Sequence, residues 1–246
     1  ESNGNANMLF VDGGNDTVAI GTSDTDFDPV ADNLIVGTGS GSNGITIYTG
    51  SSVGNKGSIF FADTAAGNAT NSRKGQITYE QNNEIMTFFT ADTKAMEIGF
   101  IGAVTKPLQP AFLAIPAAEQ TNIGLASNVT VLFGSEIFDQ NADFANNTFT
   151  APVSGKYQLN FNLYLKDIND EYQYIYSRIQ TSNRNYQIEL YPSSFFNADG
   201  RISVCGSFLA DMDASDTALV TVQVPNTGSA QMDIVVYSTF SGYLAC

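Results

Sequence analysis

The sequence predicts an all-β protein with two parts, a hairpin-rich N-terminal region and a C-terminal β-sandwich of the jelly-roll type. Apolar runs of strand length occur throughout the 246 residues and are bounded by Gly, Asn, Asp and Ser. No segment shows the apolar period of a helix. Residues 106–110, KPLQP, interrupt any strand. The length of the apolar runs changes at this point, so we place the boundary between residues 1–105 and 106–246.

Residues 1–105 contain short apolar runs within Gly-, Asn- and Thr-rich sequence. The stretch MLFVDGGNDTVAIG (8–21) predicts a hairpin with its loop at 12–16, and QITYEQNNEIMTFF (76–89) predicts a second that turns at residues 82–83. Strands this short do not build a thick core from one chain. They favour an intertwined homo-oligomer in which neighbours cover apolar faces and edges, with a small independent β-domain as the alternative.

Residues 106–246 carry longer runs in which apolar and polar residues alternate. The runs are YQLNFNLYL (157–165), YQYIYSRIQ (172–180), ISVCGSFLA (202–210), ALVTVQV (218–224) and MDIVVYSTF (232–240). Strands at this spacing, with turns such as 169–170 and 198–200 between them, are typical of a β-sandwich or jelly roll.

The chain is acidic, with a formal net charge of −15 and an isoelectric point near 4.1. This charge argues against a nucleic-acid partner, which requires a basic surface. Solubility or cation binding by loop carboxylates would explain the acidity. No apolar run approaches the roughly 18 residues of a membrane span, so we expect no membrane insertion.

The absence of histidine removes the usual general base and every Ser-His or Cys-His nucleophile pair, so we expect no enzyme. A glycan hydrolase is the enzymatic alternative, because it needs only paired carboxylates about 5–10 Å apart. Cys205 and Cys246 are too few for a structural zinc site. They form one disulfide or remain half-buried thiols.

Residues 146–157, NNTFTAPVSGKY, contain a proline and a glycine, two residues with special backbone conformations, between two strand-like stretches. Phe149 is predicted to end a strand pointing inward. Pro152 fixes φ and cannot serve a central ladder, so the chain must turn there. Gly155 then supplies the freedom to enter a new strand at Tyr157. This Phe-x-x-Pro-x-x-Gly-x-Tyr pattern resembles the complement C1q-like head domain.

Two further segments carry the same resemblance in the same order over about residues 111–246. Residues 206–224, GSFLADMDASDTALVTVQV, are similar to the family's Gly-Ser strand, turn and Val-rich strand. Residues 238–246, STFSGYLAC, are similar to its terminal strand, whose signature positions are Phe240, Gly242 and Leu244. The resemblance implies a ten-stranded jelly-roll protomer in a homotrimeric head.

No collagen-like repeat precedes this domain, so the resemblance leaves trimerisation to another part of the chain. Residues 9–22, LFVDGGNDTVAIGT, resemble segments of phage tail-fibre and other virion fibre proteins, in which such hairpins form trimeric shafts. A fibre shaft that carries a C1q-like head is a coherent pair, because both are trimeric by family.

Three tyrosines and an arginine alternate along one predicted strand and would share a face opposite two isoleucines. They are Tyr172, Tyr174, Tyr176 and Arg178. Aromatic and arginine side chains are enriched at interaction hot spots, so this face predicts a receptor-binding surface. The alternative is the seam of the trimer, which C1q-like heads line with aromatics.

Two clusters of aspartates are candidates for calcium. The first is Asp211, Asp213 and Asp216, and the second, in DTDFD, is Asp24, Asp26 and Asp28. The first is no EF-hand, because Asp216 and Val222 stand where Gly and Glu are required. Some C1q-like heads bind calcium, so either a looser Ca²⁺ site or a solvated turn fits it. An extended DTDFD would put its carboxylates on one face, where solvent or a bound cation must offset their mutual repulsion.

These features favour a non-enzymatic homotrimeric virion fibre, a phage tail fibre or spike at the virion surface. Residues 1–105 would form the shaft, and the head would bind a host cell-surface glycan or protein through loops near 167–171, 181–186 and 192–201. Alternatives are a structural virion part, such as a capsid decoration or tail connector that contacts other virion proteins, and a secreted C1q-like adhesin.

Overall fold

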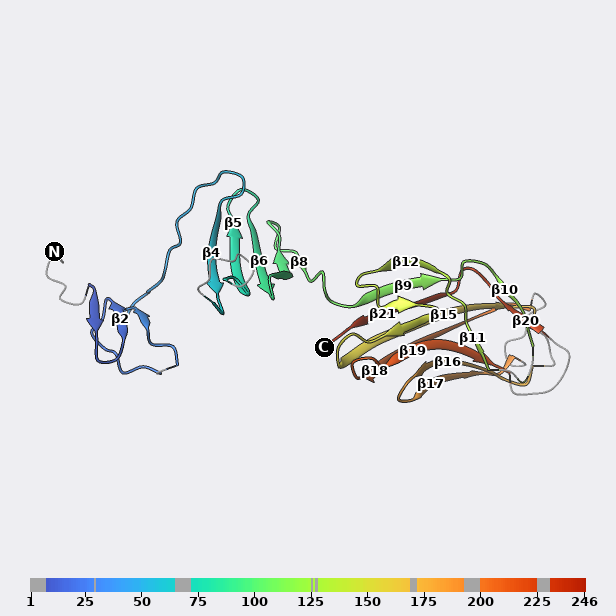
Figure 1. The fold of residues 1–246 in the computed structure, drawn as a ribbon. Helices are drawn as coiled ribbons and strands as arrows, with labels where there is room; N and C mark the ends of the chain where they lie inside the picture. The colour runs from blue at the N-terminus through green and yellow to red at the C-terminus, as the bar shows by residue number, and fades with distance from the viewer. Residues whose placement is uncertain are drawn as a thin grey trace. The chain divides into compact units, whose positions relative to one another are not determined.

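The computed structural model describes residues 8–28, 30–64, 72–124, 126, 128–168, 172–192, 200–224 and 231–246. Its regular elements are β-strands, which confirms the predicted all-β class (Figure 1). Contacts divide the chain into one unit of Glu1–Thr93 and Glu97–Val104 and a second of Lys94–Met96 and Thr105–Cys246. Within the described residues, no helix has the length and apolarity of a membrane span.

Two separate sheets precede the sandwich. The three-stranded sheet consists of β1 (Phe10–Asp12), β2 (Thr17–Ile20) and β3 (Leu34–Val36). The five-stranded sheet follows chain order through β4 (Lys56–Phe61), β5 (Gly75–Glu80), β6 (Ile85–Thr90), β7 (Thr93–Ile98) and β8 (Val104–Thr105). Both predicted hairpins are confirmed, since Asp12 pairs with Thr17 and Glu80 with Ile85.

The sandwich consists of two sheets, which we name after their central strands. The β15 sheet has the order β12-β9-β21-β15, with β18 on the other side of β15 and with β20 and β10 continuing from its end. Its strands are β9 (Ala111–Ile115), β10 (Gln120–Gly124), β12 (Ser135–Asp139), β15 (Gly155–Lys166), β18 (Ile202–Met212), β20 (Gln231–Ile234) and β21 (Thr239–Leu244).

The β19 sheet has the order β13-β14-β19-β16-β17, with β11 also paired to β19. Its strands are β11 (Asn128–Thr130), β13 (Phe144–Ala145), β14 (Thr148–Thr150), β16 (Ile175–Thr181), β17 (Asn185–Leu190) and β19 (Thr217–Gln223). The chain passes repeatedly between the two antiparallel sheets, from β15 to β16 and from β17 to β18, and this connectivity confirms the predicted jelly roll.

One core fills the space between the two sheets. Strand β15 shows why, because alternate residues along it are buried: Tyr157, Leu159, Phe161, Leu163 and Leu165. A cluster of aromatic rings closes one end of this core. The ring of Phe112 stacks on those of Phe144 and Phe149, with 4.9 Å between centroids in both cases.

The residues that carry the predicted resemblance lie where the chain turns from β14 into β15 and in β21. Phe149, Tyr157 and Phe240 are fully buried, and Leu244 packs against the core from its edge. The reason predicted for Gly155 is wrong, because its φ is not left-handed. Glycine is required at position 155 because there is no room for a side chain. A Cβ there would lie 2.7 Å from both Cys246 O and Leu244 Cδ1. Gly242 is similar, with Leu159 Cδ2 only 2.6 Å from the position of a Cβ.

Candidate recognition surface

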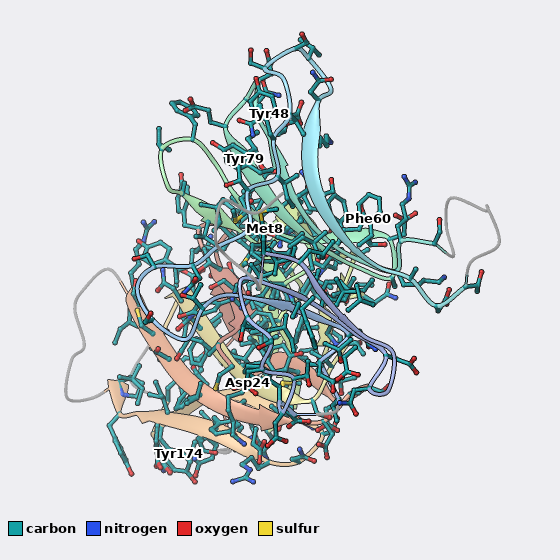
Figure 2. The ribbon with its side chains drawn as sticks, turned by 90° about the vertical axis from the view of Figure 1, so that its left-hand side faces the viewer. Met8, Asp24, Tyr48, Phe60, Tyr79 and Tyr174 are labelled. Carbon is teal, nitrogen blue, oxygen red and sulfur yellow. The ribbon has the colours of Figure 1, made fainter. Side chains whose placement is uncertain are left out.

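The outer face of β19, β16 and β17 carries the aromatic residues that the sequence singled out. Strand β16 pairs with β17 on one side and with β19 on the other. Ile175, Ser177 and Ile179 are buried between the sheets, so Tyr176 and Arg178 project outward. Figure 2 shows Tyr174 at the outer side of the sandwich.

Three tyrosines form a continuous cluster on this face. Tyr174 lies between Tyr176 and Tyr191, with ring centroids 5.1 and 6.1 Å away. The rings are tilted by 53° and 51°, so they do not cover one another face to face. We name Tyr174, Tyr176, Tyr191 and Arg178 the tyrosine surface.

Arg178 is fixed in place beside the tyrosines. Its guanidinium carbon lies 4.6 Å from the centroid of the Tyr176 ring, a cation–π contact. Its Nε donates to Gln187 Oε1 at 2.6 Å and its Nη1 to Gln223 Oε1 at 2.8 Å. These contacts reach from β16 to both neighbouring strands. They hold the surface rigid, which lowers the entropy lost when a ligand binds.

The hydroxyls of Tyr176 and Tyr191 remain protonated at neutral pH. Loss of solvent is the main cause that raises the pKa of Tyr176, and the Glu189 carboxylate adds to it. The Tyr191 hydroxyl donates to Glu189 Oε1 at 2.7 Å, and this hydrogen bond raises the pKa of Tyr191. The surface therefore offers flat aromatic area together with neutral hydroxyl groups, the composition of many recognition surfaces.

Tyr172 is a correction to the predicted face. Its side chain is 1% exposed and belongs to the core. Strand β16 begins at Ile175, so the two-residue alternation that relates Tyr176 to Arg178 does not extend back to Tyr172. The sequence reasoning also missed Tyr191, Glu189 and Gln187. A sequence signal for this strand was present, because apolar and polar residues alternate along Asn185–Leu190. The odd-numbered residues of this strand lie outward.

The predicted contact loops are only partly described. Residues 169–171 and 193–199 lie outside the described residues. The loop after β16 is well defined, because Thr181 N and Oγ1 both donate to Arg184 O, each at 2.9 Å. Asn183 at its tip donates to Asp216 Oδ2 at 2.7 Å and joins this loop to the turn before β19.

The structure does not group Asp211, Asp213 and Asp216 as a calcium site would require, which favours the predicted alternative, a solvated turn. Asp211 forms an ion pair with Lys156 on the adjacent strand, which lowers the pKa of Asp211. Asp216 Oδ2 accepts from Asp213 N at 2.8 Å as well as from Asn183, so it caps its own turn. Throughout the described ranges, no three acidic or cysteine side chains are grouped so that they could hold a metal ion.

The DTDFD segment forms no strand. Asp24 Oδ1 accepts from Asp26 N at 3.2 Å, and Asp28 Oδ1 accepts from Val30 N at 3.0 Å, so both carboxylates close local turns. The condition under which Asp24, Asp26 and Asp28 would share a face, an extended segment, is therefore not met. Of the two cysteine alternatives, the free thiols are found, but Cys205 and Cys246 are exposed instead of half-buried.

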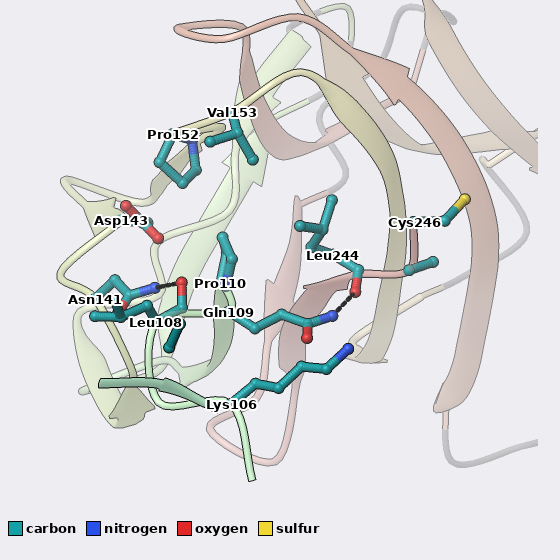
Figure 3. A pocket seen from close by; sticks show the side chains of 12 residues that line it. Lys106, Leu108, Gln109, Pro110, Asn141, Asp143, Pro152, Val153, Leu244 and Cys246 are labelled. Atoms are coloured by element: carbon teal, nitrogen blue, oxygen red, sulfur yellow. Dashed lines mark hydrogen bonds between the residues drawn. The ribbon is translucent and has the colours of Figure 1, made fainter. Parts of the chain in front are cut away.

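A pocket opens at the end of the jelly roll where β9 begins (Figure 3). It is lined by Ala95, Lys106, residues 108–110, Asn141, Asp143, the turn at 152–153 and residues 244–246. Hydrogen bonds across it fix its walls: Gln109 Nε2 donates to Leu244 O at 2.7 Å, and Asn141 Nδ2 donates to Leu108 O at 2.9 Å.

The pocket does not fit glycan hydrolysis. Asp143 and its neighbour Asp139 form a carboxylate pair, but Asp139 accepts the backbone N–H groups of Asp143 at 3.1 Å and Phe144 at 2.9 Å. Both oxygens of Asp139 are thus used to hold the loop. One carboxyl group is left facing the pocket, whereas glycan hydrolysis requires two.

Asp143→Asn is expected to stabilise the jelly roll at neutral pH. Burial, with the Asp139 charge as a second cause, raises the pKa of Asp143 above 3.8, and its Oδ2 has no hydrogen-bond partner among the described residues. In the unfolded chain the carboxyl ionises near 3.8. As the pH rises past that value, the unfolded state loses its proton first and stability falls. Thermal unfolding at pH values above 3.8 should show that stability falls less steeply with pH in Asp143→Asn than in the wild type. An unchanged pH profile would contradict the raised pKa of Asp143.

No family model and no curated protein matches the sequence. Among solved structures, the globular domain of zebrafish complement 1qA protein matches at 19% identity over 56% of this chain and 98% of that chain, with a TM-score of 0.44. Murine APRIL at pH 8.0 matches at 10% identity over 55% and 98%, with a TM-score of 0.41. Murine APRIL at pH 5.0 matches at 11% identity over the same shares, also with 0.41. At these TM-scores, the jelly-roll assignment rests on the chain's own strand order.

Proposed function

We propose that this chain is a non-enzymatic homotrimeric attachment protein, a virion fibre or spike whose jelly-roll head binds a host cell-surface glycan or protein. The observation that carries the proposal is the tyrosine surface. It presents rigid aromatic area and hydroxyl groups on the outer face of a stable sheet. Such a surface needs no movement and little ordering before it binds a partner.

Binding fits the described residues better than catalysis does. The chain has no histidine, and of the two neighbouring carboxylates Asp139 and Asp143, that of Asp139 is committed to holding a loop. Tyrosine hydroxyls with raised pKa values are hydrogen-bond donors at neutral pH and poor bases. The proposed trimer would present three tyrosine surfaces, and avidity would turn weak contacts at each head into firm attachment.

The proposal predicts that tyrosine removal abolishes surface attachment. The fluorescently labelled chain should bind members of an immobilised oligosaccharide array or a panel of intact cells. The double variant Tyr174→Ala/Tyr191→Ala should bind about tenfold more weakly or not at all. Tyr237→Ala is the matched control, because Tyr237 is 75% exposed at the turn before β21 and belongs to no part of the tyrosine surface.

The oligomeric mass separates this proposal from its main competitor. Light scattering should give about 79 kDa, three times the 26.3 kDa of one chain. If Tyr174→Ala/Tyr191→Ala lowers that mass, the tyrosine surface is the seam of the trimer instead of its contact with a host. Undiminished attachment by the same variant would exclude this surface from recognition altogether.

A further inference from the structure

The five-stranded sheet before the jelly roll has two chemically different faces. The register of β4, β5 and β6 places Ile59, Ile77 and Phe88 in one cross-strand row, and it places Tyr79 opposite Met86 on the same face. Phe61 lies on this face too, since side chains alternate along β4. We name the face formed by Ile59, Phe61, Ile77, Tyr79, Met86 and Phe88 the apolar face.

The opposite face has a polar centre. Ser58 pairs with Thr78, which pairs with Thr87, and Gln76 lies beside Thr78 on the same strand face. Phe60 belongs to this face, so Phe60 and Tyr79, both labelled in Figure 2, are on opposite sides of the sheet by register. We name it the threonine face.

Burial at the centre of the two faces is the reverse of what the chemistry there requires. On strand β5, which lies between β4 and β6, the polar Gln76 and Thr78 are only 8% and 5% exposed. Ile77 and Tyr79 on the same strand remain partly exposed, and Phe61 at the edge is 59% exposed. The main hydrophobic core of the described chain lies in the jelly roll and includes no residue of this sheet. A sheet that buries the polar centre of one face and leaves the apolar face in water is missing a layer.

The chemistry of the apolar face fits a second copy of the chain. In β4, β5 and β6 it carries no charged side chain, whereas the chain as a whole has a net charge of −15. Two copies repel through most of their surface and can approach closely over an uncharged area. A basic partner would instead be expected on an acidic area.

The size of the apolar face, and its need for a cover in the folded chain, also favour a second copy as the partner. Three six-residue strands span about 14 by 20 Å in the plane of the sheet, well below the roughly 800 Å² per partner of a stable binary complex. The face alone is therefore small for a separate protein, but it suffices between copies that also meet elsewhere. An apolar layer that stabilises its own sheet must be available wherever the chain is folded, and other copies of the chain meet this condition at assembling concentrations.

We propose that the apolar face packs against the same region of other copies of this chain and forms the oligomeric core of the N-terminal region. The proposal deepens the trimer of the proposed function by naming the residues that join the copies. It stands on the sheet's register and burial and does not depend on what the head binds.

Neighbouring phenylalanines on β4 provide a matched test. Phe61 on the apolar face is 59% exposed in the single chain and Phe60 on the threonine face is 52% exposed. Phe61→Glu should raise the concentration needed for assembly by about tenfold or more, because a buried unpaired charge opposes packing. Phe60→Glu should leave the mass unchanged. Light scattering over a dilution series measures both.

Thiol labelling gives a second measurement that does not disturb the contact with a charge. In a chain with Cys205→Ser and Cys246→Ser, Phe61→Cys should react with a maleimide about tenfold more slowly than Phe60→Cys at assembling concentrations, because a neighbouring copy excludes the reagent. The two rates should converge on dilution. Purified chain contains no other protein, so protection identifies another copy as the cover.

The outcomes separate this inference from the proposed function. A wild-type mass of 26.3 kDa at all concentrations would overturn both this inference and the trimer. A trimer whose mass is indifferent to Phe61→Glu, with equal labelling of Phe61→Cys and Phe60→Cys, would overturn this inference alone. The head could then still trimerise by itself and bind a host surface.

Discussion

Replacing Phe149 with alanine is expected to lower the free energy of unfolding of the jelly roll by about 3–5 kcal/mol. The Phe149 ring is fully buried between the two sheets. It stacks on Phe112 at 4.9 Å and lies 5.3 Å from the Tyr157 ring. Both of these rings are fixed by other contacts, so the structure cannot collapse to fill the space, and the cavity adds to the lost burial.

Urea unfolding followed by circular dichroism measures this loss as a lower midpoint of the jelly-roll transition. Phe138→Ala is the control, because Phe138 in β12 is 49% exposed, and its change should stay within about 1 kcal/mol. Equal losses for the two variants would show that Phe149 is not part of a close-packed core.

The jelly roll was predictable from the sequence because its signals are local and repeated. Alternation in 157–165 marks β15, and the pattern from Phe149 to Tyr157 marks the turn into it. The glycine at 155 was identified for the wrong reason. Its local sequence suggested backbone freedom, whereas the crowding comes from Leu244 and Cys246, which are distant in sequence.

The recognition surface was predictable only in part. Alternation identifies a face only while the strand continues, and β16 begins at Ile175, so Tyr172 was assigned to the wrong side. Tyr191 and Gln223 join the surface through pairing of β16 with two strands that lie further along the chain. The sequence of a single segment does not reveal which strands pair with it or in which register.

The aspartate cluster illustrates the same limit for charge. Spacing in DMDASD suggested convergent carboxylates, but Asp211 faces Lys156 across the β15–β18 pair, 55 residues earlier in the chain. Asp216 is held by Asn183 from the loop after β16. Long-range pairing thus satisfied each carboxylate separately, and the sequence pattern could not show it.

Gly206→Ala is expected to destabilise the jelly roll by about 1–3 kcal/mol, although it adds a single methyl group. Gly206 pairs with Phe161 across β15 and β18. A Cβ at Gly206 would lie 2.3 Å from Phe161 Cε1 and 2.8 Å from Phe208 Cε2. The Phe161 ring occupies the space above the glycine and is only 2% exposed, so it has no free volume into which to move.

Gly124→Ala provides the matched control for this effect. Gly124 also lies in a strand, β10, and a Cβ there would meet no atom within 4 Å. Its φ is not left-handed, so alanine should be neutral or stabilise by up to about 1 kcal/mol through the unfolded state. Thermal and urea unfolding of both variants should therefore change in opposite directions or differ by more than about 1 kcal/mol. If Gly206→Ala matched Gly124→Ala, the Phe161 ring would have to be mobile, and the packing that holds β18 against β15 would be looser than the structure implies.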